Sequence, residues 1–312
     1  MKAQYTIVSL VAIFTALAPL YGKDVPTIPA TTVSMIVTAA VDDGKRMPEL
    51  QKEDIFVKRG KERLPVMEFA PARGENAGLD LFIVIDDATV TGLGSHLEDL
   101  RKFVKAQPES TLVGIAYGRN AVAMIAQDLT NDHDKAARAI RLPMGSAGAY
   151  GSPYLSVADL MKRWPESTNR RQEVLLVGDG IDRARRERNA LLNPDVDYAG
   201  SVAQRRGTII HTIYFPGIGH WHRNHFDAFN GLNALAKLSD ASGGESYSLG
   251  VESPVSLVPY LESLQNVLDN QYVLSFVAKP GKKAGMQYIS ISTEVAGVDI
   301  SSADAVWIPA AK

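Results

Sequence analysis

Two continuous apolar runs, each followed closely by acidic residues, constrain the fold of this chain most. Residues 81–85 (LFIVI) lead into Asp86 and Asp87, and residues 174–177 (VLLV) lead through a glycine into Asp179. A short, unbroken apolar run predicts a strand buried on both faces, as in a parallel sheet covered by helices. Ligands of such open sheets bind beyond the carboxyl ends of the strands. We therefore expect the acids of both runs to meet in one crevice.

The pattern around these runs predicts an α/β domain between two sets of strands. Strand-like and helix-like stretches alternate over residues 79–270, which is typical of a mostly parallel sheet flanked by helices. Residues 23–78 are predicted to form an N-terminal β segment and a linker, and residues 271–312 to form C-terminal strands. We expect these two outer segments to combine in one small antiparallel β module.

Residues 1–22 have the features of an export signal peptide. Lys2 supplies a positive charge, residues 7–20 are mostly apolar, and Gly22 offers a cleavage point. The apolar stretch is short for a membrane span. We therefore expect an exported protein, whether periplasmic, on the cell surface or secreted, with no membrane span after cleavage. An uncleaved anchor is the alternative, because the residues before the cleavage point depart from the usual pattern.

The composition excludes several classes of function. The chain has no cysteine, which rules out disulfides, thiolate zinc sites and cysteine nucleophiles. Its net charge of −2 gives no electrostatic footprint for nucleic acid. The sequence contains neither a P-loop nor a dinucleotide-binding fingerprint. The basic cluster at residues 183–188 (RARRER) includes an acid, and this mixture predicts a solvated helix face.

The order of elements and three short phrases resemble von Willebrand factor A-type domains, and more closely the bacterial exported VWFA-related proteins. The phrases are residues 52–60 (KEDIFVKRG), 242–245 (SGGE) and 271–276 (QYVLSF), and the likeness covers roughly residues 33–308. The resemblance implies a von Willebrand factor A-like (Rossmann-like) fold. It also implies a divalent cation at a metal-ion-dependent adhesion site, where a carboxylate of a partner protein can complete the coordination.

The first cation-binding motif of that family, D-x-S-x-S, fits this chain in two registers. Asp86 follows the apolar run directly, but Ala88 and Val90 then stand where the serines belong. A shift by one residue restores an oxygen at every motif position, with the set Asp87, Thr89 and Thr91. Threonine supplies the same hydroxyl group as serine. The shifted register is therefore favoured, and the register that starts at Asp86 stays open.

The other two motifs of the family are only partly present. A glycine-rich loop at residues 144–151 places Ala147 at the expected threonine, with Ser146 beside it as a substitute ligand. The third motif is intact as Asp179-Gly180. The predicted ligands are oxygens, which suit Mg²⁺, with Mn²⁺ or Ca²⁺ as alternatives. Against this site stands the ordinary role of Asp, Thr and Gly as turn formers at strand ends.

Three histidines form a second group of candidate metal ligands. His220, His222 and His225 lie close together before a predicted helix, in a density that suits zinc or copper. Neighbouring glycines indicate an irregular loop, in which this spacing fixes no coordination geometry, and an inert surface loop is the alternative. A metal-assisted hydrolase would need such a site to activate water.

Taken together, these patterns favour an exported, non-enzymatic protein-binding module of the von Willebrand factor A type. It would recognise another protein through a divalent-cation site with a partly degenerate motif. One alternative is a metal-free structural scaffold of the cell envelope. The other is the metal-assisted hydrolase, although no positioned general base and no nucleophile elbow stand out in the sequence.

Overall fold

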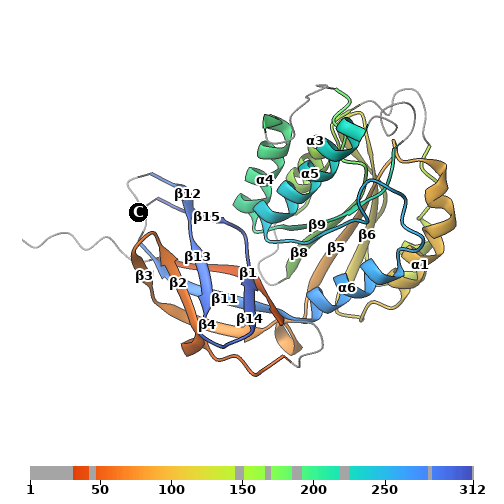
Figure 1. Cartoon of the computed structure of the whole chain (residues 1–312). Coiled ribbons are helices and arrows are strands. Elements are labelled where there is room, and N and C mark those ends of the chain that lie inside the picture. The colour runs from red at the N-terminus through yellow and green to blue at the C-terminus, as the bar shows by residue number, and fades with distance from the viewer. Residues whose placement is uncertain are drawn as a thin grey trace, which may run out of the picture.

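A six-stranded sheet forms the centre of the chain, as the alternating pattern predicted (Figure 1). The computed structural model describes residues 31–41, 47–144, 151–165, 170–184, 192–217, 225–279 and 283–310. The strand order is β10-β9-β8-β5-β6-β7, with every pair parallel except the last. The strands are β5 (Leu79–Asp86), β6 (Thr111–Arg119), β7 (Val122–Thr130), β8 (Arg171–Gly178), β9 (Ile209–Tyr214) and β10 (Ser246–Tyr247).

Helices cover both faces of this sheet, and every residue of the central strand β5 is therefore buried. The apolar side chains of β5 alternate, so that Leu81 and Ile83 face one helical layer while Phe82 and Val84 face the other. The first layer consists of α1 (Leu97–Lys105), α2 (His133–Arg138) and α6 (Val258–Asp269). The second consists of α3 (Pro153–Arg163), α4 (Pro194–Arg206) and α5 (His225–Ser242). Short 3-10 helices span Lys52–Asp54, Gly74–Asn76 and Thr91–His96.

The N- and C-terminal strands combine in an antiparallel β module, which confirms that part of the predicted fold. Its sheets have the orders β14-β1-β11-β4, β13-β2-β3 and β12-β15, around a shared apolar core. From the N-terminal side come β1 (Thr31–Val41), β2 (Ile55–Arg59), β3 (Glu62–Leu64) and β4 (Val66–Pro71). From the C-terminal side come β11 (Gln271–Ala278), β12 (Gly285–Tyr288), β13 (Ser290–Thr293), β14 (Val298–Ser301) and β15 (Ala305–Ile308).

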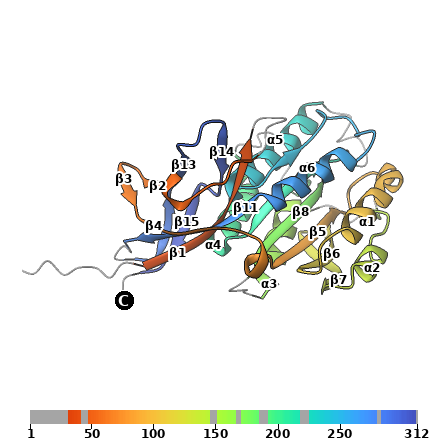
Figure 2. The ribbon, with the colours of Figure 1, turned by 90° about the horizontal axis from the view of Figure 1, so that it is seen from below.

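The α/β domain is inserted between two neighbouring strands of the β module. The chain leaves β4 for the domain and returns through α6 into β11, and β4 and β11 pair with each other in antiparallel register. Seen from below, the β module lies beside one end of the α/β sheet, where its strand β15 contacts α4 (Figure 2). Both connections between the two parts therefore lie close together.

One buried arginine fastens this junction. Arg171, at the start of β8, donates from Nη1 to the carbonyl of Leu268, at 2.9 Å, and to the side-chain oxygen of Gln271. Its Nη2 donates to the carbonyl of Ala77 at 3.4 Å. The single guanidinium therefore ties the incoming linker, the end of α6 and the start of β11 to the central sheet.

The segment before α1 and the N-terminal residues complete the description of the chain. Ser95 lies in the 3-10 helix before α1, where its hydroxyl donates to the carbonyl of Gly92 at 2.8 Å. The predicted signal peptide, residues 1–22, lies outside the described residues. Within the described part of the chain, no helix has the length and apolar character needed to cross a membrane.

Replacing Arg171 by methionine should destabilise the protein, because the apolar stem remains while three buried acceptors lose their donor. We expect the free energy of unfolding in urea to fall by about 2–3 kcal/mol. The exposed Lys102→Met on α1 is the control, with an expected change of about 0.5 kcal/mol or less. Equal stability of the Arg171→Met variant and the wild type would show that this junction does not depend on the guanidinium.

Candidate functional site

Asp86 and Asp179 meet at the carboxyl ends of β5 and β8, where the two apolar runs predicted a crevice. The two strands pair in parallel, and their last paired residues are Ile85 and Val177. Both acids come directly after this pair and therefore lie at the same edge of the sheet. The chain continues from β5 to β6 on one side and reaches β8 on the other, which makes this edge a topological switch point. Asp86 is 5% exposed and Asp179 is 1% exposed.

An arginine joins these two carboxylates. Arg183 donates from Nη1 to Oδ1 of Asp179 at 3.1 Å and contacts Oδ2 through Nη2. The same Nη1 lies 3.9 Å from Oδ2 of Asp86. The Arg183 side chain is 2% exposed, so a full positive charge lies in the protein interior between two acids. This forked arrangement suits a guanidinium better than an ammonium group.

Backbone amides also donate to the same two carboxylates. The amide of Ala88 donates to Oδ1 of Asp86 at 2.9 Å, and the amide of Ile181 donates to Oδ1 of Asp179 at 3.0 Å. The hydroxyl of Thr89 donates to the backbone carbonyl of Asp86 at 2.7 Å. Each turn therefore holds its own acid in place.

The loop after β9 closes over the acid pair and requires a glycine there. Thr89 and Gly217 form an isolated antiparallel bridge, and the amide of Val90 donates to the carbonyl of Pro216 at 3.1 Å. A Cβ atom on Gly217 would lie 1.7 Å from Oδ2 of Asp179 and 2.3 Å from Nη2 of Arg183. Any side chain at this position would displace the ion pair.

Asp87 has a different partner from Asp86. Its carboxylate receives Nη1 of Arg141 at 2.9 Å and Nη2 at 3.2 Å, and it also accepts the amide of Met144 at 3.1 Å. The guanidinium of Arg141 stacks over the ring of Tyr117, 3.6 Å from its centroid. The favoured register, which places Asp87 with Asp179 on one ion, is therefore not the arrangement observed. Asp86 is the residue that shares the guanidinium of Arg183 with Asp179.

The described residues do not offer an ion the predicted shell of oxygens. The carboxylates of Asp87 and Asp179 are paired with arginines, and no group of three histidine or acidic side chains among the described residues is placed to hold a metal ion. Ser146, the side chain of Thr91, and two histidines of the loop, His220 and His222, lie outside the described residues, and their predicted roles stay predictions. His225 is the first residue of α5 and is exposed.

Sequence reasoning missed the two arginines of this site. Arg183 belongs to the basic cluster that was expected to form a solvated helix face, and for this residue the expectation is wrong because the side chain is buried. A usable signal was present, since Arg183 follows Asp179 by four residues. The register that starts at Asp86 lacks the serine hydroxyls that would help to hold a divalent cation. A buried acid pair without that cation needed another source of positive charge. Arg141 gave no comparable signal.

The site holds a proton more tightly than a carboxylate in water does. Burial raises the pKa of Asp86 to about 7; the charge of Arg183 opposes this rise, and the neighbouring Asp179 adds to it. Burial also raises the pKa of Tyr154, whose hydroxyl donates to the carbonyl of Gly180 next to Asp179. Below neutral pH, one proton on Asp86 leaves one carboxylate of the pair for one guanidinium.

Asp86→Asn should change how stability depends on pH. The pKa of Asp86 is higher in the folded protein than in the unfolded chain, so the folded state holds a proton between about pH 4 and pH 7 that the unfolded state has released. That contribution to stability is present at low pH and is lost as the pH rises towards 7. Unfolding in urea should therefore show the variant gaining on the wild type from pH 4 to pH 7.5, by on the order of 4 kcal/mol. If the free energies of unfolding of the variant and the wild type changed with pH in parallel, the raised pKa of Asp86 would be contradicted.

The comparisons with known proteins found similar solved structures but no similar sequence. No protein-family model matches the sequence, and no curated protein matches it. The structure is similar to BatB from Bacteroides thetaiotaomicron (TM-score 0.43, 10% identity, 61% of this chain and 97% of that chain). It is similar to the SpRpn10 VWA domain (0.40, 13%, 60% and 94%). A further similar structure is the ArnB paralog VWA2 from Sulfolobus acidocaldarius (0.41, 11%, 90% and 77%). The α/β domain described here has a mostly parallel six-stranded sheet with helices on both faces.

Proposed function

We propose that this chain is an exported, non-enzymatic protein-binding module of the von Willebrand factor A type that works without a bound divalent cation. The observation that carries the proposal is the guanidinium of Arg183 between Asp86 and Asp179. In this position the chain supplies its own positive charge to the acid pair. The signal-like residues 1–22 support export.

The chemistry around the pair supports the metal-free version. Magnesium requires a nearly complete octahedral shell of oxygens, and Ala88 and Val90 provide none from their side chains. A divalent ion would have to displace a buried guanidinium that already contacts both oxygens of Asp179. Breaking such a buried pair is costly unless the replacement satisfies both acids.

An exposed apolar surface near the carboxyl ends of the strands supports protein binding. The amide of Met144 contacts Asp87, Leu192 stands just before α4, and Phe226 and Phe229 lie in the first turns of α5. The exposed fractions are 57% for Met144, 69% for Leu192, 57% for Phe226 and 52% for Phe229. Exposed aromatic and methionine side chains are enriched where proteins contact one another.

Titration with Mg²⁺ and Mn²⁺ tests the role of Arg183. We expect no binding heat and no thermal shift for the wild type, because the acid pair already has its cation. The triple variant Ala88→Ser, Val90→Ser, Arg183→Ser should gain a rise in melting temperature with Mn²⁺, since two unpaired acids and two new hydroxyls face one space. The control keeps Arg183 and carries the two serines, and it should not respond. Stoichiometric metal binding by the wild type would overturn the metal-free proposal.

Capture of a partner protein tests the proposed surface. The purified protein, immobilised, should retain a partner from envelope extracts equally well with EDTA and with Mg²⁺. The double variant Phe226→Asp, Phe229→Asp should lose that partner, because both rings are replaced by charges. Lys102→Glu on α1 is the control and should retain it, with circular dichroism confirming that all variants fold. A partner that requires Mg²⁺, or that ignores both aromatic changes, would contradict the proposal.

A further inference from the structure

A cavity of about 710 Å³ lies along α4, where strand β15 of the β module contacts that helix. Gln172 lines this α4 cavity near the start of β8, whereas Asp179 follows the end of the same strand. Seven residues of strand span about 20 Å. The α4 cavity is therefore separate from the site at Asp86 and Asp179.

One face of α4 forms a wall of this cavity. Tyr198, Val202 and Arg205 line the cavity and follow one another at intervals of four and three residues, which is the spacing of neighbours on one helix face. Seven residues of helix rise by about 10 Å, so the wall extends over about that length along the helix axis. A compact ligand would therefore reach only part of it.

Two cations stand over aromatic rings in the α4 cavity. Nζ of Lys162, on α3, lies 5.0 Å from the centroid of the Tyr198 ring. The guanidinium of Arg205 lies 4.3 Å from the ring centroid of Trp307, on β15. Within the described part of the chain, neither cation has a carboxylate partner. An aromatic face attracts a cation without neutralising its charge, so both cations can still pair with negative groups.

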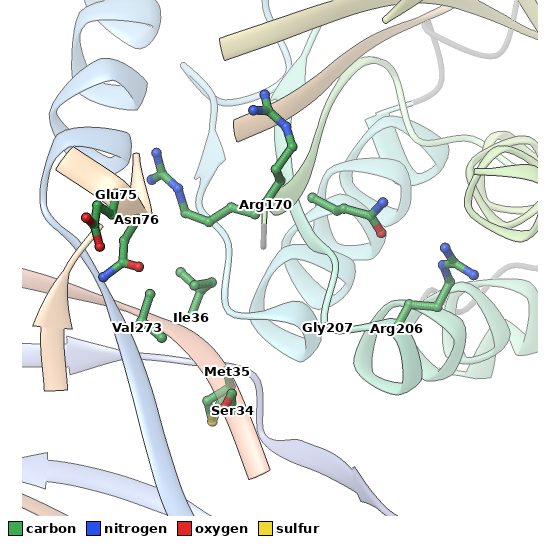
Figure 3. Close-up of a pocket in the computed structure, with 11 residues that line it drawn as sticks. Ser34, Met35, Ile36, Glu75, Asn76, Arg170, Arg206, Gly207 and Val273 are labelled. Atoms are coloured by element: carbon green, nitrogen blue, oxygen red, sulfur yellow. The ribbon is translucent and has the colours of Figure 1, made fainter. Parts of the chain in front are cut away.

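Acidic side chains do not compensate this charge at the α4 cavity. The described residues that line it include no acid. The adjoining cavity of about 480 Å³ does include an acid, Glu75, but Figure 3 shows Glu75 on the side opposite Arg206, which lines both cavities. On α3 and α4, the acids next to these cations in sequence pair with other residues, Asp159 with Arg163 and Asp197 with Lys237. The α4 cavity therefore favours a negatively charged ligand.

We propose that the α4 cavity binds a small organic dianion, in which an apolar or ring-shaped body separates two negative groups. One group would meet Lys162 and the other Arg205, while the body would lie along Val202 between the two rings. Gln172 adds a fixed polar group to the wall, since it is 7% exposed and donates from Nε2 to the carbonyl of Pro165 at 2.8 Å. The length of the α4 wall favours such a ligand over a compact ion. This inference does not depend on the proposed protein binding.

Calorimetric titration of the purified protein with matched probes tests the proposal. Digalacturonate and biphenyl dicarboxylate represent sugar and aromatic dianions, and the diamide of each, which has a similar shape without charge, is its control. Inorganic pyrophosphate supplies charge without a body. We expect at least one dianion to bind about tenfold or more tightly than its diamide and pyrophosphate do, and to bind more weakly as salt rises. The dianion that binds more tightly identifies the ligand as a sugar acid or an aromatic acid.

Variants of the cavity locate the binding. The variant Lys162→Gln, Arg205→Gln should bind the dianion about tenfold or more weakly, because both charges are removed. Tyr198→Leu should weaken binding about threefold, because Lys162 loses the ring that holds it. The control Lys102→Gln, Lys135→Gln makes the same change in charge on the opposite helical layer and should bind like the wild type, with circular dichroism confirming that all variants fold. Three results would overturn the proposal: no binding of either dianion, equal binding of pyrophosphate, or unchanged affinity in the Lys162→Gln, Arg205→Gln variant.

Discussion

Two carboxylates at the ends of adjacent parallel strands repel each other, and the rest of the site follows from how that charge is compensated. β5 and β8 pair directly, so Asp86 and Asp179 reach the same buried edge of the sheet. An interior with few polar groups makes uncompensated charge expensive. This chain meets the requirement with Arg183 and with the raised pKa of Asp86. The glycine at position 217 leaves space for this solution.

Arginine performs related tasks at three separate places in the molecule. Arg183 links two turns of the sheet edge, Arg141 holds Asp87 away from that pair, and Arg171 fastens the β module to the α/β domain. In each case several donors of one planar group reach acceptors on different segments. A lysine offers a single charged point and would not span the same acceptors. The order of this protein therefore depends on the geometry of its guanidinium groups as well as on apolar packing.

The sequence predicted the architecture well because that architecture depends on apolar periodicity. Residues 81–85 and 174–177 identified central strands, and the outer strands joined in one β module as expected. The site was harder to predict, because a motif specifies residue types without specifying which way each side chain turns. Asp86 and Asp87 are neighbours in sequence, yet they pair with different arginines. Motif matching favoured the neighbour with more hydroxyls nearby, whereas the fold brought the other one to Asp179.

The insertion of the α/β domain between β4 and β11 has a mechanical consequence. Thr31 begins the first strand of the β module and Ile308 ends its last, so a pulling force applied at these points would act first on the hydrogen bonds of the β module. The chain leaves the β module at β4 and returns to it at β11, and these two strands pair with each other. The inserted domain would therefore carry little of that load. The inserted domain would keep its shape under tension until the strands of the β module separate.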